Sequence, residues 1–202
     1  MKIVRVETLI SSGPFAKSES WFTVRNALFK EIRAVDWPRG SGEFTIHPQS
    51  GKRRGEGNGV RPIKDGLIAK LKRNGWKTEE PLPLAVAARP GKLDAVLYAG
   101  RGAIALEWET GNISSSHRAL NKMALGLMTG TLLAGVLVVP SRKLYRFLTD
   151  RVGNFDELEP YLDLWKSIPC KNGVLELVVI EHDAESTRVR RIPKGTDGRA
   201  RQ

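Results

Sequence analysis

Apolar positions follow the spacing of regular secondary structure most clearly in the middle of the chain. Two apolar runs, 92–100 and 102–110, flank a Gly-Arg-Gly turn and predict a β-hairpin. Residues 114–130 repeat apolar side chains on one helical face and start with three serines, which predicts a serine-capped amphipathic helix. The uninterrupted apolar run 134–141 is typical of a strand buried on both faces. Because the helix crosses between two strands, these should run parallel with a right-handed connection.

The flanking segments supply further elements. Residues 20–37 place Phe22 and Leu28 on roughly one face of a helix that Pro38 should end. Shorter helices are expected at 63–76, closed by Gly75, and around 143–148 and 155–166, with a further strand at 174–183. This order predicts an α/β fold with a central mixed β-sheet flanked by helices.

The length of 202 residues fits a single domain spanning 1–202. Within it, residues 47–66 are rich in Gly, Lys and Arg, and this composition predicts a long basic loop outside the core. Residues 92–140 would form the central, chemically active core. The basic segment 188–202 is expected to be a mobile tail.

The charge and the cysteine content limit which binding partners and which cellular compartment are expected. The net charge of +11 favours nucleic acid or another anionic surface as a partner. The single cysteine cannot form an internal disulfide. Arg5 and Glu7 interrupt the apolar N-terminus, which argues against a signal peptide, and the apolar run 127–140 is too short for a bilayer, which needs ~20 residues. We therefore expect a cytoplasmic protein without a membrane partner.

Two acidic residues at the end of the second hairpin strand suggest chemistry. Glu107 and Glu109 share one face of the strand, since side chains alternate. A hairpin turn centred near Arg101 would bring Asp94 opposite residue 108 or 109. Three carboxylates could then meet within a few ångströms, and hard oxygen ligands of this kind suit Mg²⁺. Such an ion would activate water and stabilise a leaving oxygen at a phosphodiester.

An isolated acid at a strand end is more often solvated or salt-bridged, and the chain has 33 basic residues to offer. The combination at hairpin spacing in a basic chain favours catalysis over that structural interpretation.

Asp94 followed by the string Glu107-Trp108-Glu109 resembles the core of the PD-(D/E)xK nucleases. Most members have lysine where Glu109 stands, but glutamate or glutamine can occur there in the BamHI and BglII group of type II restriction endonucleases. The strings EWETGNISSSHRALNKM, GNGVRPIKDG and GWKTE also resemble BglII-like enzymes, over roughly residues 44–139.

The resemblance implies a restriction-type endodeoxyribonuclease that hydrolyses double-stranded DNA at a short palindromic site, leaving 5′-phosphate and 3′-hydroxyl ends. It makes Asp94 and Glu107 ligands of Mg²⁺ and Glu109 the group that orients or deprotonates water. Mn²⁺ is a substitute, and Ca²⁺ is expected to support binding without cleavage. A homodimer would present one active site to each strand. The transition-state charge that a lysine would supply passes to Lys122, to another neighbour or to a second metal ion.

Candidate DNA contacts come from the basic loop and from the helix after the acids. Loop cations could neutralise phosphates, or one arginine could read guanine. The helix start could offer N–H groups to a phosphate. For each residue a solvated or capping role is the alternative. The candidates are Lys52, Arg53, Arg54, Asn58, Arg61, Lys64, Ser114, Ser115, His117, Asn121 and Lys122.

Two other functions remain open from the sequence. One is a nuclease of the same core that acts in DNA repair, junction cleavage or phage defence. The other is a basic DNA-binding protein whose acids are structural.

Overall fold

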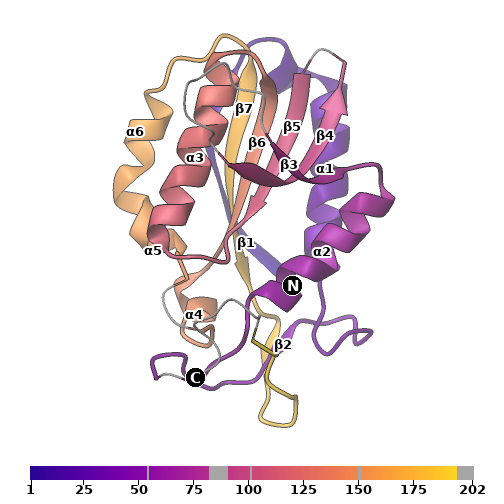
Figure 1. Cartoon of the computed structure of the whole chain (residues 1–202), viewed down its shortest axis with the longest axis vertical. Helices are drawn as coiled ribbons and strands as arrows, with labels where there is room; N and C mark the ends of the chain where they lie inside the picture. Colours follow the sequence, from indigo (N-terminus) through magenta and orange to yellow (C-terminus); the bar gives the residue numbers. More distant parts are fainter. Residues whose placement is uncertain (54, 82–90, 101, 150–151, 195–202) are drawn as a thin grey trace.

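A six-stranded mixed sheet forms the centre of the molecule (Figure 1). The computed structural model describes residues 1–53, 55–81, 91–100, 102–149 and 152–194. The strand order is β1-β7-β6-β5-β4-β3. The strands β5, β6 and β7 run parallel, whereas β4 pairs antiparallel with β3 and β5, and β1 pairs antiparallel with β7. The strands are β1 (Lys2–Ser12), β3 (Lys77–Pro81), β4 (Lys92–Ala99), β5 (Gly102–Trp108), β6 (Leu132–Pro140) and β7 (Gly173–Glu181).

Helices cover both faces of the sheet, as the alternation of helical and strand patterns predicts. Helices α1 and α2 pack on one face, while α3, α5 and α6 pack on the other. A small parallel pair, β2 (Thr45–Ile46) and β8 (Ala184–Glu185), lies beside the sheet. The helices are η1 (Phe15–Lys17), α1 (Glu19–Arg33), α2 (Arg61–Arg73), α3 (Ile113–Met128), α4 (Arg142–Tyr145), α5 (Phe155–Leu158), η2 (Glu159–Tyr161) and α6 (Leu162–Lys166).

The hairpin, the crossing helix and the parallel strand of the central block are confirmed. Leu106 and Trp108 are buried in the cluster that includes residues of α1 and α2, so the apolar face of β5 packs on helices as expected. Strand β6 is buried along nearly its whole length. Within the described residues, no helix combines the length and the apolar character that crossing a bilayer requires.

Several local predictions are wrong. Helix α1 ends at Arg33, well before Pro38, and Phe22 is 48% exposed while Trp21 is buried. Helix α3 is capped by Asn112, whose side chain accepts a hydrogen bond from Ser115 N at 3.3 Å, so the serines are not its cap. An asparagine is as good an N-cap as serine, and Asn112 stands two residues before Ser114.

The segment 47–66 is not a flexible loop throughout. Its last residues already belong to α2, and Asn58 is fully buried. A side chain at Gly51 would come within 1.6 Å of Leu148 O, and one at Gly59 within 1.9 Å of Pro193 O. These glycines therefore allow a close approach between backbones rather than mobility.

The expected mobile tail is also partly wrong. Ile192 is 1% exposed and donates its backbone N–H to Asn58 Oδ1 at 3.0 Å. Residues 188–194 are thus anchored against the segment that contains Asn58. The remainder of the predicted tail, 195–202, lies outside the described residues.

Candidate active site

The register of β4 and β5 places Asp94 beside Glu107. Ala95 pairs with Leu106, and Ala99 pairs with Gly102. The hairpin is therefore centred between residues 100 and 101, not at Arg101, which itself lies outside the described residues. Trp108 N donates to Asp94 Oδ2 at 2.8 Å, and Asp94 N donates to Glu107 Oε2 at 3.3 Å. The expected pairing of Asp94 with residue 108 or 109 is wrong by one to two positions.

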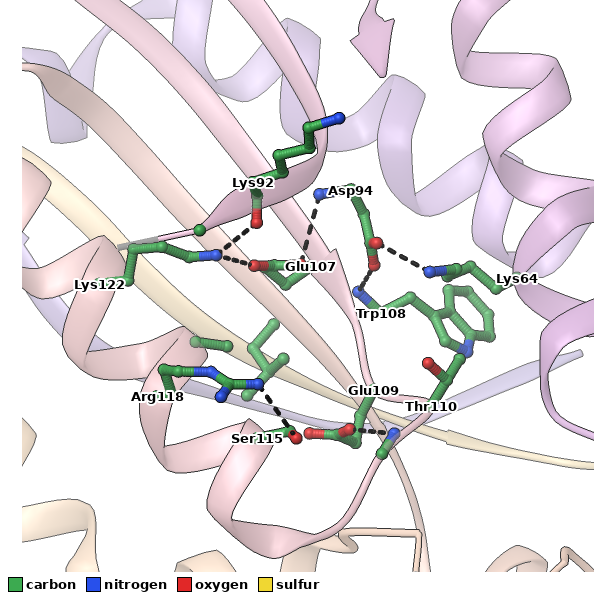
Figure 2. A pocket seen from close by; sticks show the side chains of 14 residues that line it. Lys64, Lys92, Asp94, Glu107, Trp108, Glu109, Thr110, Ser115, Arg118 and Lys122 are labelled. Carbon is green, nitrogen blue, oxygen red and sulfur yellow. Dashed lines mark hydrogen bonds and ion pairs between the residues drawn. The ribbon is translucent and has the colours of Figure 1, made fainter. Parts of the chain in front are cut away.

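Each of these two carboxylates also meets a lysine (Figure 2). Lys64 Nζ on α2 lies 2.8 Å from Asp94 Oδ1. Lys122 Nζ on α3 lies 2.5 Å from Glu107 Oε1 and 2.6 Å from the carbonyl oxygen of Lys92. Both carboxylates thus have one oxygen held by a backbone N–H and the other neutralised by an ammonium group.

Burial governs the electrostatics of Glu107. Loss of solvation raises the pKa of this carboxyl above its ordinary value, with Lys122 acting in the opposite direction and the nearby Asp94 charge adding to the rise. Lys122 is the contact that favours the ionised form. Without it, Glu107 would be a buried carboxylate beside another.

Glu109 turns away from the lysines toward the start of α3. Its side chain is buried; Gly111 N donates to Oε1 at 2.5 Å, and the buried Ser116 Oγ donates to Oε2. Burial raises the pKa of Glu109 to about 7, against the opposing effect of these two hydrogen bonds. A carboxyl that ionises near neutral pH suits proton exchange with water.

All three acids line one open pocket of about 420 Å³, together with several cations (Figure 2). Its basic lining residues are Lys64, Lys92, Arg118 and Lys122. The sequence interpretation missed Lys92, Arg118 and Ser116. Arg118 could have been found, since it stands four residues before Lys122 and so on the same helical face. Ser116 carries no such signal apart from the serine run.

The prediction of one three-carboxylate centre is wrong in geometry. Within the described parts of the chain, no group of three acidic, histidine or cysteine side chains is placed to hold a metal ion. Asp94 and Glu107 nevertheless present adjacent hard oxygens to the pocket, a donor set that fits Mg²⁺ when water and phosphate complete the shell. The chemistry of this donor set fits a divalent cation, and Lys64 and Lys122 contact the same two acids.

The predicted DNA contacts separate into four groups. Lys52 and Arg53 are exposed, as is Ser114, while Ser115 is half-buried; Arg61 is exposed and lies 3.9 Å from Asp65. Arg54 lies outside the described residues. Lys64 and Lys122 belong to the acidic pocket described above.

Three further candidates make contacts within the protein: Asn58 is buried, His117 is half-buried and Asn121 is exposed. His117 packs its ring against Tyr161 and Trp165, with ring centroids 4.8 and 5.3 Å away. Asn121 Oδ1 accepts a hydrogen bond from Trp165 Nε1 at 2.9 Å. Asn58 donates to two backbone carbonyls and accepts from a third backbone group, so its interpretation as a flexible turn is wrong.

A solved structure shares this architecture. The crystal structure of restriction endonuclease BglII complexed with a DNA 16-mer matches with a TM-score of 0.62, covering 95% of this chain and 88% of that one. At 12% identity this likeness concerns the fold alone. The mixed sheet with its acidic pocket is that of a protein with the restriction endonuclease fold.

Sequence comparison narrows this class to one family. A family model described as restriction endonuclease BamHI matches residues 1–199. The type II restriction enzyme OkrAI of Oceanobacter kriegii is 48% identical over 200 residues, covering 99% of both chains. The type II restriction enzyme BamHI of Bacillus amyloliquefaciens is 34% identical over 184 residues, covering 88% of this chain and 82% of that one. The chain belongs to the BamHI family of restriction endonucleases.

Membership settles the class of activity that the sequence left open. The chain is an enzyme, a sequence-specific type II restriction endonuclease, and the alternative of a non-catalytic binding protein is set aside. Enzymes of this family use a divalent metal ion. The residues that perform the reaction in this chain stay predictions.

Proposed function

We propose that this enzyme is a cytoplasmic, Mg²⁺-dependent endodeoxyribonuclease that cuts both strands of a short palindromic DNA site. Water is the nucleophile, and the products carry 5′-phosphate and 3′-hydroxyl ends. The observation that supports this proposal is the placement of Asp94, Glu107 and Glu109 along one open pocket with a basic lining. Acids supply ligands and a proton acceptor, while cations attract the phosphate backbone.

The roles of the three acids follow from their surroundings. Asp94 would hold the cation through Oδ1, which faces Lys64, while Trp108 N keeps Oδ2 in place. Glu107 would hold it through Oε2, so that Lys122 keeps its contact with Oε1. When bound, Mg²⁺ supplies Lewis acidity at the scissile phosphate and lowers the pKa of a bound water. Glu109, with its pKa raised to about 7 by burial, takes a proton from the attacking water.

Lys122 would supply the positive charge that Glu109 cannot. It is 7% exposed at its side chain and fixed by two acceptors, so its ammonium group is preorganised. A fixed charge costs no reorganisation when the transition state forms. Arg118 lies on the same helical face, in the pocket lining, and would contact an adjacent phosphate.

A homodimer follows from a two-fold symmetric DNA site. Apolar side chains are exposed on the helical layer that includes α3 and α6: Met128 is 52% exposed, Tyr161 48% and Leu164 62%. Burial of these side chains against a second copy would remove apolar surface from water. The dimer surface we propose is therefore this layer.

Plasmid cleavage with mapped ends tests the proposal. With Mg²⁺, the wild-type chain should cut at a fixed short palindrome, with Mn²⁺ substituting. Asp94→Asn and Glu107→Gln should lose cleavage by roughly two orders of magnitude or more while DNA binding persists in Ca²⁺. Glu43→Gln is the matched control, since Glu43 is an exposed carboxylate outside the pocket. Cleavage at wild-type rate by both pocket variants would contradict the proposed roles.

A further inference from the structure

Lys64 occupies the oxygen of Asp94 that faces the proposed cation site. Asp94 Oδ2 accepts from Trp108 N at 2.8 Å, so the orientation of the carboxylate is set by the neighbouring strand. Its other oxygen, Oδ1, lies 2.8 Å from Lys64 Nζ (Figure 2). The side chains of Lys64 and Asp94 are 17% and 12% exposed, so water screens this pair only partly. An ammonium group thus stands where a metal ion would need to bind.

The two lysines of the pocket differ in how firmly they are held. Lys122 rises from the middle of α3, has 7% of its side chain exposed, and donates to both Glu107 and the carbonyl of Lys92. Lys64 lies in the first turn of α2, directly after the basic segment, and its ion pair with Asp94 is the contact the structure records for its ammonium group. The ammonium group of Lys64 can therefore leave its carboxylate at a lower cost in free energy than that of Lys122, because it loses fewer contacts.

We infer that Lys64 is an exchangeable counter-ion of Asp94, which a divalent cation displaces and which then pairs with a phosphate group of the DNA. This inference rests on the proposed metal site. A divalent cation and an ammonium group cannot both contact Asp94 Oδ1. Two positive charges bound to the same oxygen would lie close together and repel strongly in a partly buried pocket. The exchange changes only the anionic partner of the Lys64 ammonium group.

The exchange gives the site two useful properties. Before the cation arrives, Asp94 is neutralised and kept in the right orientation, so two adjacent carboxylates do not repel each other. Once the cation is bound, Lys64 is released from Asp94 and becomes a free positive charge in the lining of the acidic pocket. Cation binding should therefore strengthen the attraction for a phosphate, and phosphate should strengthen cation binding in return.

Titration with Mn²⁺ at pH 8, without DNA, tests the competition. The electron paramagnetic resonance signal of free Mn²⁺ reports binding without any cleavage. Lys64→Gln should bind Mn²⁺ roughly three- to tenfold more tightly than wild type, because the competing charge is gone. Lys72→Gln is the control: it removes the same charge from an exposed position on the same helix. Asp94→Asn should abolish the binding.

A second measurement uses the wild-type chain and so does not depend on the stability of a variant. Lysines are acylated briefly with and without Ca²⁺, and each site is quantified by mass spectrometry. Lys64 should become several-fold more reactive with Ca²⁺ once released, whereas Lys122 stays protected and Lys72 stays equally reactive.

The outcomes separate this inference from the proposed function. Should Mn²⁺ bind wild type and depend on Asp94, yet bind Lys64→Gln no more tightly while Lys64 stays protected, the exchange is overturned and the metal site stands. Should Mn²⁺ bind neither wild type nor Lys64→Gln, the metal site fails and the exchange fails with it.

Discussion

Lys122 Nζ lies 2.5 Å from Glu107 Oε1, in a contact between the middle of α3 and the end of β5 where both side chains are largely buried. The neighbouring acids Asp94 and Glu109 are also held by hydrogen bonds or an ion pair. Each acid of the pocket has one oxygen bonded to a backbone N–H, and the other bonded to a lysine or a serine. The fold therefore holds each acid in position by two contacts, although burial disfavours the ionised forms of Glu107 and Glu109.

Removal of Lys122 should cost stability because Glu107 would be left as an unpaired buried charge. We expect Lys122→Met to lower the free energy of unfolding by about 3 kcal/mol at pH 8. The loss should shrink at low pH, where Glu107 takes up a proton, since burial already raises the pKa of this carboxyl. Urea denaturation of metal-free protein measures both effects.

A double variant isolates the pair. Lys122→Met with Glu107→Gln should recover most of the lost stability, because no charge then remains unpaired. The exposed Lys72 provides a control in Lys72→Met, which should change the free energy of unfolding little. If the double variant is no more stable than Lys122→Met alone, the ion pair is not the source of the loss.

Glu109 should make stability fall as pH rises. Its native pKa of about 7 lies above the ordinary value of 4.5, so the folded chain binds more protons than the unfolded chain between these two values. The contribution is neutral below the window and unfavourable above it, by about 3 kcal/mol at full ionisation. Glu109→Gln should remove this slope in metal-free denaturation between pH 4.5 and 8. An unchanged slope in that variant would assign the pH dependence to another group.

The sequence located the acids but not their partners. The spacing of apolar residues and the alternation of side chains along a strand are local signals. They were enough to predict the hairpin, α3 and β6, and to predict that Glu107 and Glu109 lie on one face of the same strand. The ion pair of Lys64 with Asp94 joins residues 30 positions apart on elements whose packing no periodic pattern reports. The predicted partner of Asp94 was wrong because the turn was placed half a residue too far along the chain. A shift of this size changes the partner of every residue in the hairpin by one position.

The edge strand β1 was missed for a different reason. Arg5 and Glu7 interrupt its apolar pattern, and two register shifts in its pairing with β7 disturb the alternation. In the folded chain these residues lie on the same strand, 2.6 Å apart as an ion pair, and Arg5 also meets Glu159. Charged residues on an edge strand are common, since one side of it faces solvent. Such a strand is poorly distinguished from a loop by composition.

Charge introduced at the proposed dimer surface should separate the subunits. The wild-type chain should have twice the monomer mass of 22.4 kDa in light scattering after gel filtration. Leu164→Glu, at the most exposed apolar side chain of α6, should shift it to the monomer mass and reduce cleavage of both strands. Phe22→Glu is the control, because Phe22 is similarly exposed on α1, in the helical layer on the opposite face of the sheet. A dimer that survives Leu164→Glu and dissociates with Phe22→Glu would move the interface to α1.

Asn58 should act on stability and not directly on DNA. Its Nδ2 donates to His47 O and Phe147 O at 2.9 Å each, and its Oδ1 accepts from Ile192 N at 3.0 Å, all in a fully buried position. Asn58→Ala would leave these backbone groups without partners in the interior, at a cost of roughly 2–4 kcal/mol. Thermal melting without DNA measures this loss.

Lys52 lies on the same segment but is exposed, so its substitution should affect DNA binding and not stability. Comparing the two variants therefore separates a structural role from a DNA contact. Lys52→Ala should leave the melting temperature unchanged but lower the slope of log affinity against log salt by about 0.9, the value for one phosphate contact. Asn58→Ala should leave that slope unchanged when binding is measured below its melting temperature, because its side chain joins three backbone segments and does not reach solvent. A normal melting temperature combined with weakened DNA binding in Asn58→Ala would show that the side chain contacts DNA after all. The segment would then have to open on binding, since only a rearranged backbone could expose Asn58.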